Sequence, residues 1–561
     1  MARPGPAKGM SNRYRAAARE ASQTAVPVEE VFGLREEAYQ ADLQRSLDAS
    51  SQLEAERDRV RDRVESGINR RDFLKRGGLV GAGVVGLTML NSAGSLTTRT
   101  NAATAPRIVI VGGGFAGLTA AYRIYKLKGW AAQVYEATDR VSGRVETIRG
   151  KMQDGIYFEE CASAIDTNQT GPGSITNLAN ELGLTPFDDV WLNYLNGDEV
   201  YNYLGKPYTW NQLKAGVAAI DSYARNLWNK IKFLPAYNKT NATATTWDNK
   251  TVVDLINSTA YPVTTPAGAY YAQTFGSDAG GPAGMSSAIH VILNQGGKTI
   301  WPSGAKKFDE RWAIPGGNDT MASTLASRIP AGSVHLDRAL IAIKKNIDNT
   351  YTLTFQNSGG AITTVIADRV VMANPPTTMK HIDYSAAGFS VLKVKCFSQP
   401  LGNNAKLAFQ FNGQAWGPAS GDAYSDMVTG DTWPVQFKGT KSPHLLMENN
   451  KDYPTLPPIE QGAPAYVVTE TLAALDKLFP GISSKFIPGQ AYISQHTQET
   501  YAGGSYAYYR PGDFTRYQGY QKVREGNVHF AGEHTADYAR IGYMDGAVRT
   551  GERVATEVTS Y

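Results

Sequence analysis

Three glycines spaced as G-x-G-x-x-G are the first residues of this chain whose types and positions suggest chemistry. Gly112, Gly114 and Gly117 directly follow residues 107–111, which predict a buried parallel strand, and lead into a predicted helix over residues 118–127. The first glycine permits a tight turn, the second lets the backbone approach a pyrophosphate, and the third lets the helix pack closely on the strand. This arrangement predicts a nucleotide-binding turn.

An acidic residue supports the same interpretation. Residues 133–135 predict a second strand, and Glu136 follows it about 20 residues beyond the glycines. A carboxylate at this place accepts hydrogen bonds from the ribose hydroxyls of an adenosine and disfavours a 2′-phosphate. Phe115 and Ala116 are expected beside the phosphates, because free N–H groups at a helix N-terminus point toward such a ligand.

The composition limits the classes of protein that can carry this turn. The chain has 561 residues, 42% of them hydrophobic, so it can bury a large core. Its 56 basic and 52 acidic residues give a net charge of +4, which argues against an electrostatic nucleic-acid binder. The only cysteines are Cys161 and Cys396, and no cysteine–histidine cluster has metal-site spacing. Collagen-like, disulfide-rich and multi-span membrane proteins are excluded, and no metal site is predicted.

Two further motifs resemble the flavin amine oxidase family. Residues 140–147 resemble the Arg-x-Gly-Gly-Arg-x-x-Thr stretch that lies along the flavin diphosphate in that family, with Ser142 in place of the first glycine of the pair. Residues 527–553 resemble its C-terminal signature, in which a helix N-terminus faces the flavin and stabilises the anionic reduced ring. The cofactor implied is FAD. By resemblance, its contacts in these motifs are Arg144, Gly532, Glu533 and Met544.

The resemblance also implies the fold. We expect an α/β protein with a Rossmann-like FAD-binding domain assembled from three chain segments, and an α+β substrate domain with a helical insert. Residues 314–319 and the strand around Leu340 fit the middle flavin segment, so Leu340 is an expected cofactor contact. The expected segments are a charged N-terminal extension (1–69), a signal region (70–105), the first FAD segment (106–165), a substrate domain with helical insert (166–300), the second FAD segment (301–375), the substrate-domain sheet (376–497) and the third FAD segment (498–561).

A lysine on a predicted strand is a candidate for catalysis. Residues 404–411 alternate like a strand around Lys406, and Trp416 follows them. In the family, a lysine in a Lys-x-x-x-x-Phe strand reaches a water beside flavin N5. The resemblance therefore implies that Lys406 favours reduction of O2 to peroxide, and that Trp416 contacts the substrate. Taken alone, the residues also fit a solvent-facing lysine on an edge strand.

Two tyrosines are predicted to form the walls of an amine site. Tyr506 and Tyr543 fall where monoamine oxidases place two facing rings, which can orient an amine and attract its cationic form. Either tyrosine alone also fits an ordinary core position. Ser505 stands where mammalian monoamine oxidases carry a cysteine bonded to the flavin. Serine cannot form that thioether, so noncovalent FAD is predicted.

The substrate's carboxylate is the point at which the sequence departs from L-amino-acid oxidases. Those enzymes carry an arginine in the stretch that aligns with residues 158–165, and Ala164 stands in its place here. A carboxylate in a closed aromatic cavity without a cation is costly. Either the substrate has no carboxylate, or another arginine binds it. Arg540 is the candidate, and a surface arginine without a ligand is the alternative.

The N-terminal region resembles an export signal. Arg70 and Arg71, followed by Asp-Phe-Leu-Lys and a weakly apolar run over residues 77–90, resemble a twin-arginine leader. That run is too short for a stable membrane span. Export of the folded protein to the periplasm or the outside is therefore expected, although a basic helix end beside an apolar turn is the alternative. A charged helix predicted over residues 28–66 could join two copies as a homodimer.

Together these motifs predict an exported FAD-dependent oxidase. It would convert an amine or L-amino acid to an imine, and then to a carbonyl and ammonia, while reducing O2 to hydrogen peroxide. The expected partners are a small-molecule amine or L-amino acid and O2, and no nucleic acid. Two other functions stay open: a flavin-dependent desaturase or dehydrogenase with another acceptor, and a non-catalytic flavin-binding interaction protein.

Overall fold

The computed structural model describes residues 105–167, 171–190, 198–297, 312–417, 419–435 and 443–560. The predicted extension over residues 1–69 and nearly all of the predicted signal region lie outside these residues. None of the helices in the described part of the chain combines the length and the apolar character needed to cross a membrane.

The glycine turn follows the central strand of a parallel sheet. Five strands lie in the order β19-β13-β1-β2-β9. Their bounds are β1 (Ile108–Val111), β2 (Gln133–Tyr135), β9 (Val334–His335), β13 (Arg369–Met372) and β19 (Val528–Phe530). Strand β1 is apolar throughout because both of its faces are covered. Ile108 and Ile110 pack among helices, and Val109 and Val111 pack against a second sheet.

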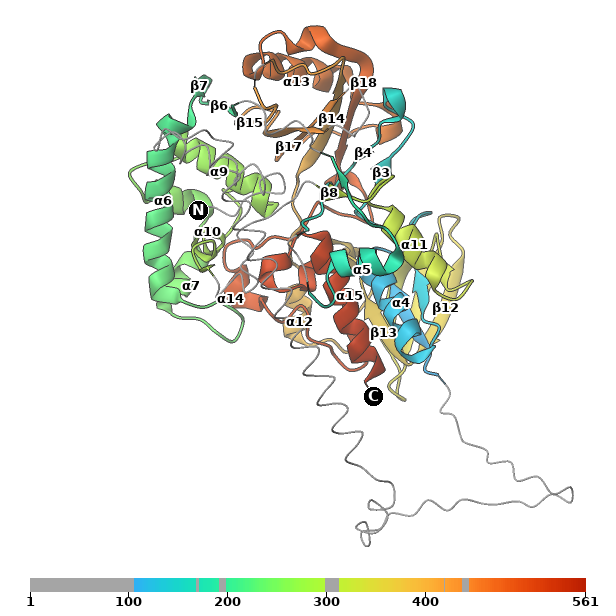
Figure 1. Ribbon diagram of the computed structural model, residues 1–561. Coiled ribbons are helices and arrows are strands. Elements are labelled where there is room, and N and C mark those ends of the chain that lie inside the picture. The colour runs from blue at the N-terminus through green and yellow to red at the C-terminus, as the bar shows by residue number, and fades with distance from the viewer. Residues whose placement is uncertain are drawn as a thin grey trace, which may run out of the picture. The chain divides into compact units, whose positions relative to one another are not determined.

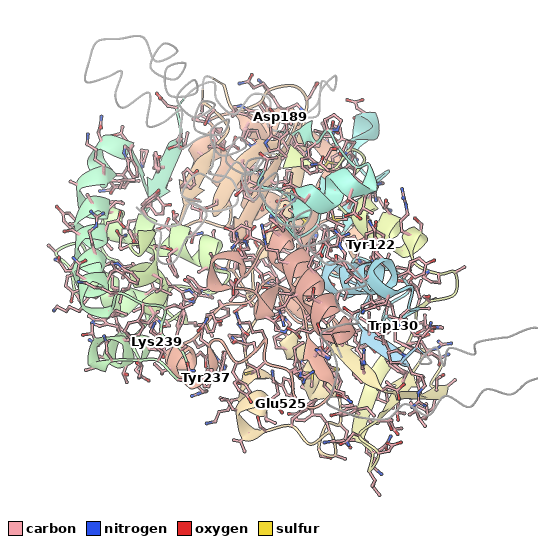
Figure 2. All side chains as sticks on the ribbon, turned by 60° about the horizontal axis from the view of Figure 1, so that its bottom comes forward. Tyr122, Trp130, Asp189, Tyr237, Lys239 and Glu525 are labelled. Atoms are coloured by element: carbon pink, nitrogen blue, oxygen red, sulfur yellow. The ribbon has the colours of Figure 1, made fainter. Side chains whose placement is uncertain are left out.

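Three separated chain segments build the layers around this sheet. Helices α4 (Phe115–Lys128) and α15 (Met544–Thr559) lie side by side on one face, together with α5 (Ile175–Leu182) and α11 (Thr320–Arg328) (Figure 1). The opposite face packs against an antiparallel sheet of β10 (Ala339–Lys345), β11 (Tyr351–Gln356) and β12 (Ile362–Ala367). Tyr122 of α4, labelled in Figure 2, donates a 2.7 Å hydrogen bond to Glu181 of α5. The predicted α/β fold with a three-segment domain is confirmed.

The candidate lysine lies on an interior strand of a larger sheet, next to the edge strand. Seven strands lie in the order β18-β14-β17-β16-β15-β6-β7. Their bounds are β6 (Val200–Tyr203), β7 (Lys206–Tyr208), β14 (Ala405–Phe411), β15 (Ala423–Ser425), β16 (Asp431–Val435), β17 (His444–Asn449) and β18 (Phe486–Gln495). Every residue of β14 is buried, and helix α13 (Ala465–Leu478) packs with Leu407 and Phe409. The edge-strand alternative for Lys406 is therefore wrong.

A group of helices forms the remaining core. Helices α6 (Trp210–Ile231), α7 (Ala242–Asp248), α8 (Val252–Asn257), α9 (Pro266–Ala279) and α10 (Ile289–Leu293) contribute to it (green helices at the left of Figure 1). Helices α12 (Val391–Cys396) and α14 (Asp513–Tyr517), from later in the chain, also bury residues in this core. Two short ribbons, β3 (Thr147–Ile148) with β4 (Phe158–Glu159), and β5 (Asp188–Asp189) with β8 (Trp312–Ala313), connect these parts.

Several chain segments lie in other parts of the fold than the predicted boundaries imply. Helix α5, predicted in the substrate domain, buries Ile175 and Leu178 in the same core as Val548 of α15. Strands β6 and β7, in the segment predicted as substrate domain with helical insert, extend the seven-stranded sheet. Helix α14, predicted in the third FAD segment, buries Phe514 among the helices of the insert. The part of the fold to which each of these elements belongs depends on which other element covers its apolar face. The spacing of residues within one segment does not contain that information.

Candidate active site

A cavity of about 230 Å³ receives residues from the ends of the parallel strands, the two neighbouring helices and the seven-stranded sheet. The predicted cofactor residues that line it are Gly112, Gly114, Phe115, Ala116, Glu136, Arg144, Leu340, Gly532, Glu533 and Met544. Gly117 is absent from the wall. The predicted nucleotide residues are thus brought together around one space, although they lie far apart in the sequence.

The glycine turn is shaped by contacts within the protein as well as by the cavity. Gly112 has a φ of +104°, a conformation that side-chain-bearing residues rarely adopt. A Cβ on Gly117 would lie 2.0 Å from the Gly112 carbonyl oxygen, so only glycine allows α4 to approach the strand this closely. Gly117 therefore serves the close packing that its place in the motif predicts, and it does not line the cavity. The helix begins after Gly114 without a side-chain cap, which leaves its first N–H groups free for an anion.

The carboxylate of Glu136 is ordered beside this turn. It is 7% exposed, and it accepts hydrogen bonds from the Gly113 N–H at 2.7 Å and from the Thr138 N–H at 2.9 Å. It also accepts from the Thr138 hydroxyl at 2.9 Å, and a carboxylate has a further acceptor position beyond these three bonds. Glu136 can therefore receive ribose hydroxyls where it lines the cavity.

An ion pair joins the first and third segments at the cavity wall. Arg144 donates to the Glu533 carboxylate at 2.9 Å and to the Ser505 carbonyl oxygen at 2.7 Å. The second carboxylate oxygen of Glu533 accepts from the Gly542 N–H at 2.9 Å. Two residues predicted from opposite ends of the sequence thus stabilise each other, and both face the cavity.

A second uncapped helix N-terminus faces the same space. Helix α15 begins after Tyr543 without a side-chain cap, and its first residue, Met544, lines the wall. Asp545 accepts from the Ile175 N–H at 2.8 Å, which fixes this end of the helix. Two free helix ends, a ribose acceptor and a glycine turn together suit a dinucleotide with a diphosphate and an electron-accepting ring. The residues present therefore fit FAD.

Lys406 belongs to a buried polar cluster that also contains a residue the sequence analysis missed. Register pairs Lys406 of β14 directly with Glu448 of β17, and the ammonium donates to the carboxylate at 2.8 Å. Both residues line the cavity. The other oxygen of Glu448 accepts from Tyr506 at 3.0 Å and from Asn404. A carboxylate directly after the apolar residues Leu-Leu-Met was the available signal, but its partner depends on strand register.

The two predicted tyrosines both line the cavity. The Tyr506 hydroxyl donates to the Ser277 carbonyl oxygen and receives a 2.8 Å bond from Asn404. A Cβ on Gly542 would lie 3.1 Å from the Tyr506 ring, so the residue next to Tyr543 is in close contact with Tyr506. The tyrosines are therefore brought to one end of the cavity, beside Lys406 and Glu448.

Trp416 and Arg540, the two residues predicted to contact the substrate, lie outside the cavity wall. Trp416 is 2% exposed and packs in the core between the seven-stranded sheet and α13. Arg540 forms an ion pair with Asp545 at 3.2 Å, and neither it nor Trp416 lines the cavity. The structure therefore brings neither residue to the cavity wall, and their contact with the substrate is not proposed further. Family resemblance suggested Trp416, and proximity in the chain to Tyr543 suggested Arg540, whereas the fold turns their side chains toward core packing and toward a helix end.

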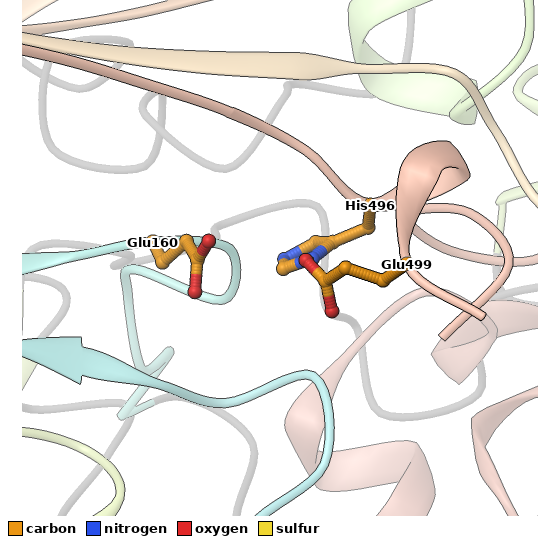
Figure 3. Close-up of side chains that lie close together, drawn as sticks. All are labelled: Glu160, His496 and Glu499. Atoms are coloured by element: carbon orange, nitrogen blue, oxygen red, sulfur yellow. The ribbon is translucent and has the colours of Figure 1, made fainter. Parts of the chain in front are cut away.

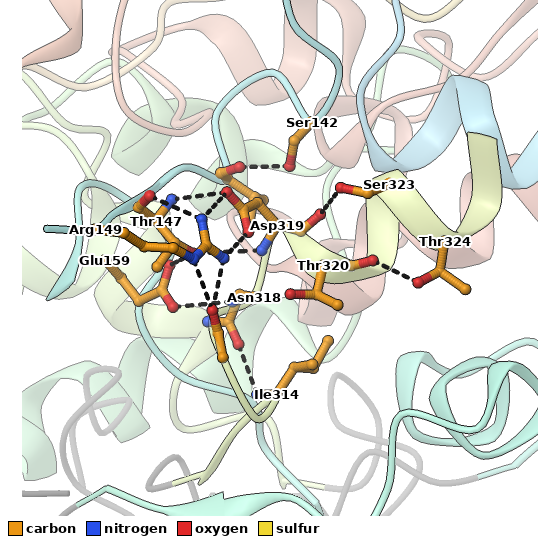
Figure 4. A network of polar contacts seen from close by, with 12 residues as sticks. Ser142, Thr147, Arg149, Glu159, Ile314, Asn318, Asp319, Thr320, Ser323 and Thr324 are labelled. Carbon is orange, nitrogen blue, oxygen red and sulfur yellow. Dashed lines mark hydrogen bonds and ion pairs between the residues drawn. The ribbon is translucent and has the colours of Figure 1, made fainter. Parts of the chain in front are cut away.

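A polar network between the first and second FAD segments contains an acid with an unusual pKa (Figure 4). Glu159 accepts from the Asn318 N–H and from the Thr147 hydroxyl, both at 2.9 Å, and Arg149 pairs with Asp319 close by. Burial raises the pKa of Glu159 from 4.5 to about 8, despite these hydrogen bonds.

This pKa predicts a pH-dependent contribution to stability. The folded state holds the Glu159 proton more tightly than the unfolded state, so the contribution is fully present below pH 4.5 and is lost as pH rises toward about 8. The slope is at most about 1.4 kcal/mol per pH unit. Urea unfolding of the wild type and of Glu159→Gln across this pH range measures the contribution of Glu159. The contributions of the other titrating groups cancel in the difference between the two free energies of unfolding. A stability difference that is constant with pH would contradict the shifted pKa.

Comparison with known proteins covers most of the cavity-bearing region. Residues 115–559 match the family model described as flavin containing amine oxidoreductase. Flavin-containing amine oxidase A of Canis lupus familiaris is 26% identical over 482 residues, covering 80% of this chain and 84% of that protein. A putative flavin-containing monoamine oxidase of Mycobacterium tuberculosis (strain CDC 1551 / Oshkosh) is 25% identical over 484 residues, covering 81% of this chain and 96% of that protein.

Solved structures match the same fold. Putrescine oxidase bound to putrescine aligns with a TM-score of 0.66 and 21% identity, covering 81% of this chain and 99% of that one. Cyclohexylamine oxidase from Brevibacterium oxydans IH-35A aligns with a TM-score of 0.66 and 17% identity over the same shares. At these identities the likeness is one of fold.

Proposed function

Because the chain belongs to the flavin containing amine oxidoreductase family, we propose that it is an FAD-dependent oxidase of amines that carry no carboxylate. The chemistry that bound FAD supplies is acceptance of a hydride from the amine's α-carbon and transfer of two electrons to O2, which gives hydrogen peroxide. The imine product is then hydrolysed by water to a carbonyl and ammonia. The alternatives are an L-amino-acid substrate or a different electron acceptor.

One observation carries the preference for amines. Around the tyrosine end of the cavity, the described residues provide no cation that is free to pair with a carboxylate. Lys406 is paired with Glu448, Arg540 is outside the wall, and Ala164 lines the cavity. A buried carboxylate without a partner costs several kcal/mol. An uncharged amine, by contrast, can bind between aromatic rings.

The chain's own residues have distinct roles in this proposal. Tyr506 and Tyr543 flank the amine and orient its nitrogen. The hydroxyl of Tyr506 is fixed by Asn404 and Glu448, so the ring is held without contacts from the substrate. The Lys406 ammonium provides positive charge where oxygen is reduced, and Glu448 holds it in place.

Peroxide release tests the substrate class. The FAD-loaded protein is given each L-amino acid and, separately, the amine formed by its decarboxylation. We expect kcat/KM to favour the amine by about 100-fold, since the unpaired carboxylate costs roughly 3 kcal/mol.

Arg540→Ala is the matched variant for this experiment, and it should leave the preference unchanged. A preference for amino acids that Arg540→Ala abolishes would overturn the proposal. Bleaching of the flavin without peroxide would identify another acceptor, and failure of every amine to bleach it would favour a non-catalytic flavin-binding protein.

Two properties are proposed from the sequence. FAD is held noncovalently, because Ser505 cannot form a thioether, and acid precipitation should leave all flavin in the supernatant. The folded protein is exported through the twin-arginine-like leader. Replacing Arg70 and Arg71 by lysine should keep it in the cytoplasm, and unchanged export would exclude that route.

A further inference from the structure

A histidine and two glutamates from distant parts of the chain meet beside the cavity. Glu160, His496 and Glu499 each offer one potential ligand atom, and these three atoms lie within 4.8 Å of one another (Figure 3). Bonds from such atoms to a zinc ion are about 2.0–2.2 Å long, so two ligand atoms of one ion are at most about 4.4 Å apart. The three side chains therefore need only a small inward movement to hold one ion.

Backbone contacts fix these residues independently of any ion. Glu160 directly follows β4, and its carbonyl oxygen accepts from the Ser494 hydroxyl of β18 at 3.3 Å. His496 begins the single turn η6 (His496–Gln498), which the Glu499 N–H closes on the His496 carbonyl oxygen at 3.2 Å. Residues three apart in such a turn present their side chains on the same side. The cluster thus joins the first FAD segment to the end of the seven-stranded sheet.

The imidazole of His496 has one engaged and one uncommitted nitrogen. Its Nδ1 is hydrogen-bonded to the Glu499 carboxylate, and its Nε2 has no hydrogen-bond partner among the described residues. His496 is 2% exposed, and a buried polar atom without a partner is rare in proteins. In Figure 3 the ring extends from η6 toward the Glu160 carboxylate, with the Glu499 carboxylate beside it. A carboxylate on one nitrogen and a free second nitrogen are features of a metal-binding histidine.

The charge of the cluster also favours a cation. Glu160 is buried, and two arginines of the cavity wall are engaged with other carboxylates. Arg140 pairs with Glu146, and Arg144 pairs with Glu533 at 2.9 Å. Buried carboxylates are costly unless a positive charge accompanies them, and one imidazole cannot balance two carboxylates. A divalent ion would supply the missing charge.

Another histidine–glutamate pair of this chain obtains that charge from an arginine. His529 is buried, and its Nδ1 lies 3.0 Å from one oxygen of the Glu557 carboxylate. Arg553 donates to the other oxygen of Glu557 at 2.6 Å. An arginine therefore accompanies the pair there, whereas a second carboxylate accompanies His496. His529 is thus a matched control, with the same residue types in a pair that already has its cation.

We propose that Glu160, His496 and Glu499 form a binding site for one divalent transition-metal ion of the zinc type. Carboxylates alone would suit Mg²⁺ or Ca²⁺, but an imidazole nitrogen favours zinc and similar metals. Three protein ligands leave the fourth position of a zinc ion to water. Glu499 lines the cavity, and its side chain is 41% exposed, which gives the ion a path to the site. Spacing within the sequence predicts no metal site, because distant segments contribute the ligands.

Equilibrium dialysis against Zn²⁺ followed by metal analysis tests the site. The full chain is FAD-loaded, carries no histidine tag and is first freed of metal with EDTA. We expect the wild type to retain one Zn²⁺ per chain more than His496→Asn does, because that variant should bind the ion at least about 100-fold more weakly. Glu160→Gln should show a similar loss, and His529→Asn should bind like the wild type. Zn²⁺ should also raise the thermal unfolding midpoint of the wild type but not that of His496→Asn.

Equal Zn²⁺ content in the wild type and in folded His496→Asn would overturn the proposal. If His496→Asn fails to fold, Glu160→Gln replaces it, and wild-type affinity in that variant would overturn the proposal as well. Equal retention of Mg²⁺ and Zn²⁺ by the wild type would contradict the assignment to a transition metal. A loss in His529→Asn as large as that in His496→Asn would show that the effect does not come from the ligands. Metal content is measured without turnover, so the result does not depend on the proposed function.

Discussion

Replacing Lys406 by methionine is expected to slow the reaction of the amine-reduced enzyme with O2 by about 100-fold. The Lys406 side chain is 8% exposed and lines the cavity. Water screens a charge poorly there, so the ammonium strongly stabilises the negative charge that develops as oxygen accepts electrons. Reduction by the amine should change by less than about tenfold, because that step needs no cation at this position. Stopped-flow absorbance of the flavin measures both steps separately.

A second substitution separates the role of the charge from a loss of stability. Lys406→Met leaves the buried Glu448 carboxylate without its cation, which should lower the free energy of unfolding by about 3–5 kcal/mol. The double variant Lys406→Met/Glu448→Gln should recover most of this loss, because an amide oxygen can still accept from Tyr506 or Asn404. Urea unfolding measures the recovery. A double variant that regains both the stability and the normal rate with O2 would show that the ammonium has no part in the oxygen reaction.

Replacing Gly117 or Gly114 by alanine is expected to affect different properties: the stability of the FAD-free protein in one case, and FAD binding in the other. A Cβ on Gly117 meets the Gly112 carbonyl oxygen at 2.0 Å, so Gly117→Ala should destabilise the FAD-free protein by about 3 kcal/mol. A Cβ on Gly114 has its nearest neighbour, the Ser142 carbonyl oxygen, at 3.9 Å. Gly114→Ala should therefore change that stability by less than about 0.5 kcal/mol.

For the affinity of the protein for FAD we expect the opposite order, with the larger effect from Gly114→Ala. Gly114 lines the cavity, and a methyl group there blocks the approach of the backbone to the diphosphate, so Gly114→Ala should weaken FAD binding by about 100-fold. Titration of FAD into each variant, together with urea unfolding of the FAD-free proteins, tests both halves. Equal loss of stability in the two variants would contradict the assignment of packing to Gly117 and of ligand approach to Gly114.

Local spacing was sufficient to predict the nucleotide end of the site. The strand, the turn at Gly112 and Gly114, and the helix that follows are consecutive in the chain, and so is the strand that ends at Glu136. Backbone geometry within about 30 residues determines how such a unit folds. The C-terminal motif around Glu533 and Met544 is equally local. Its meeting with Arg144 became predictable only through resemblance to a family whose fold joins the two ends.

Which side chains meet at the substrate end of the cavity depends on the tertiary structure. Glu448 meets Lys406 because antiparallel register pairs them, and a register shift of one residue would turn either side chain to the other face. Trp416 and Arg540 are close in sequence to site residues but face a core and a helix end. The sequence determined which chemistry each local unit could carry, whereas register and packing between distant segments determined which side chains share the cavity.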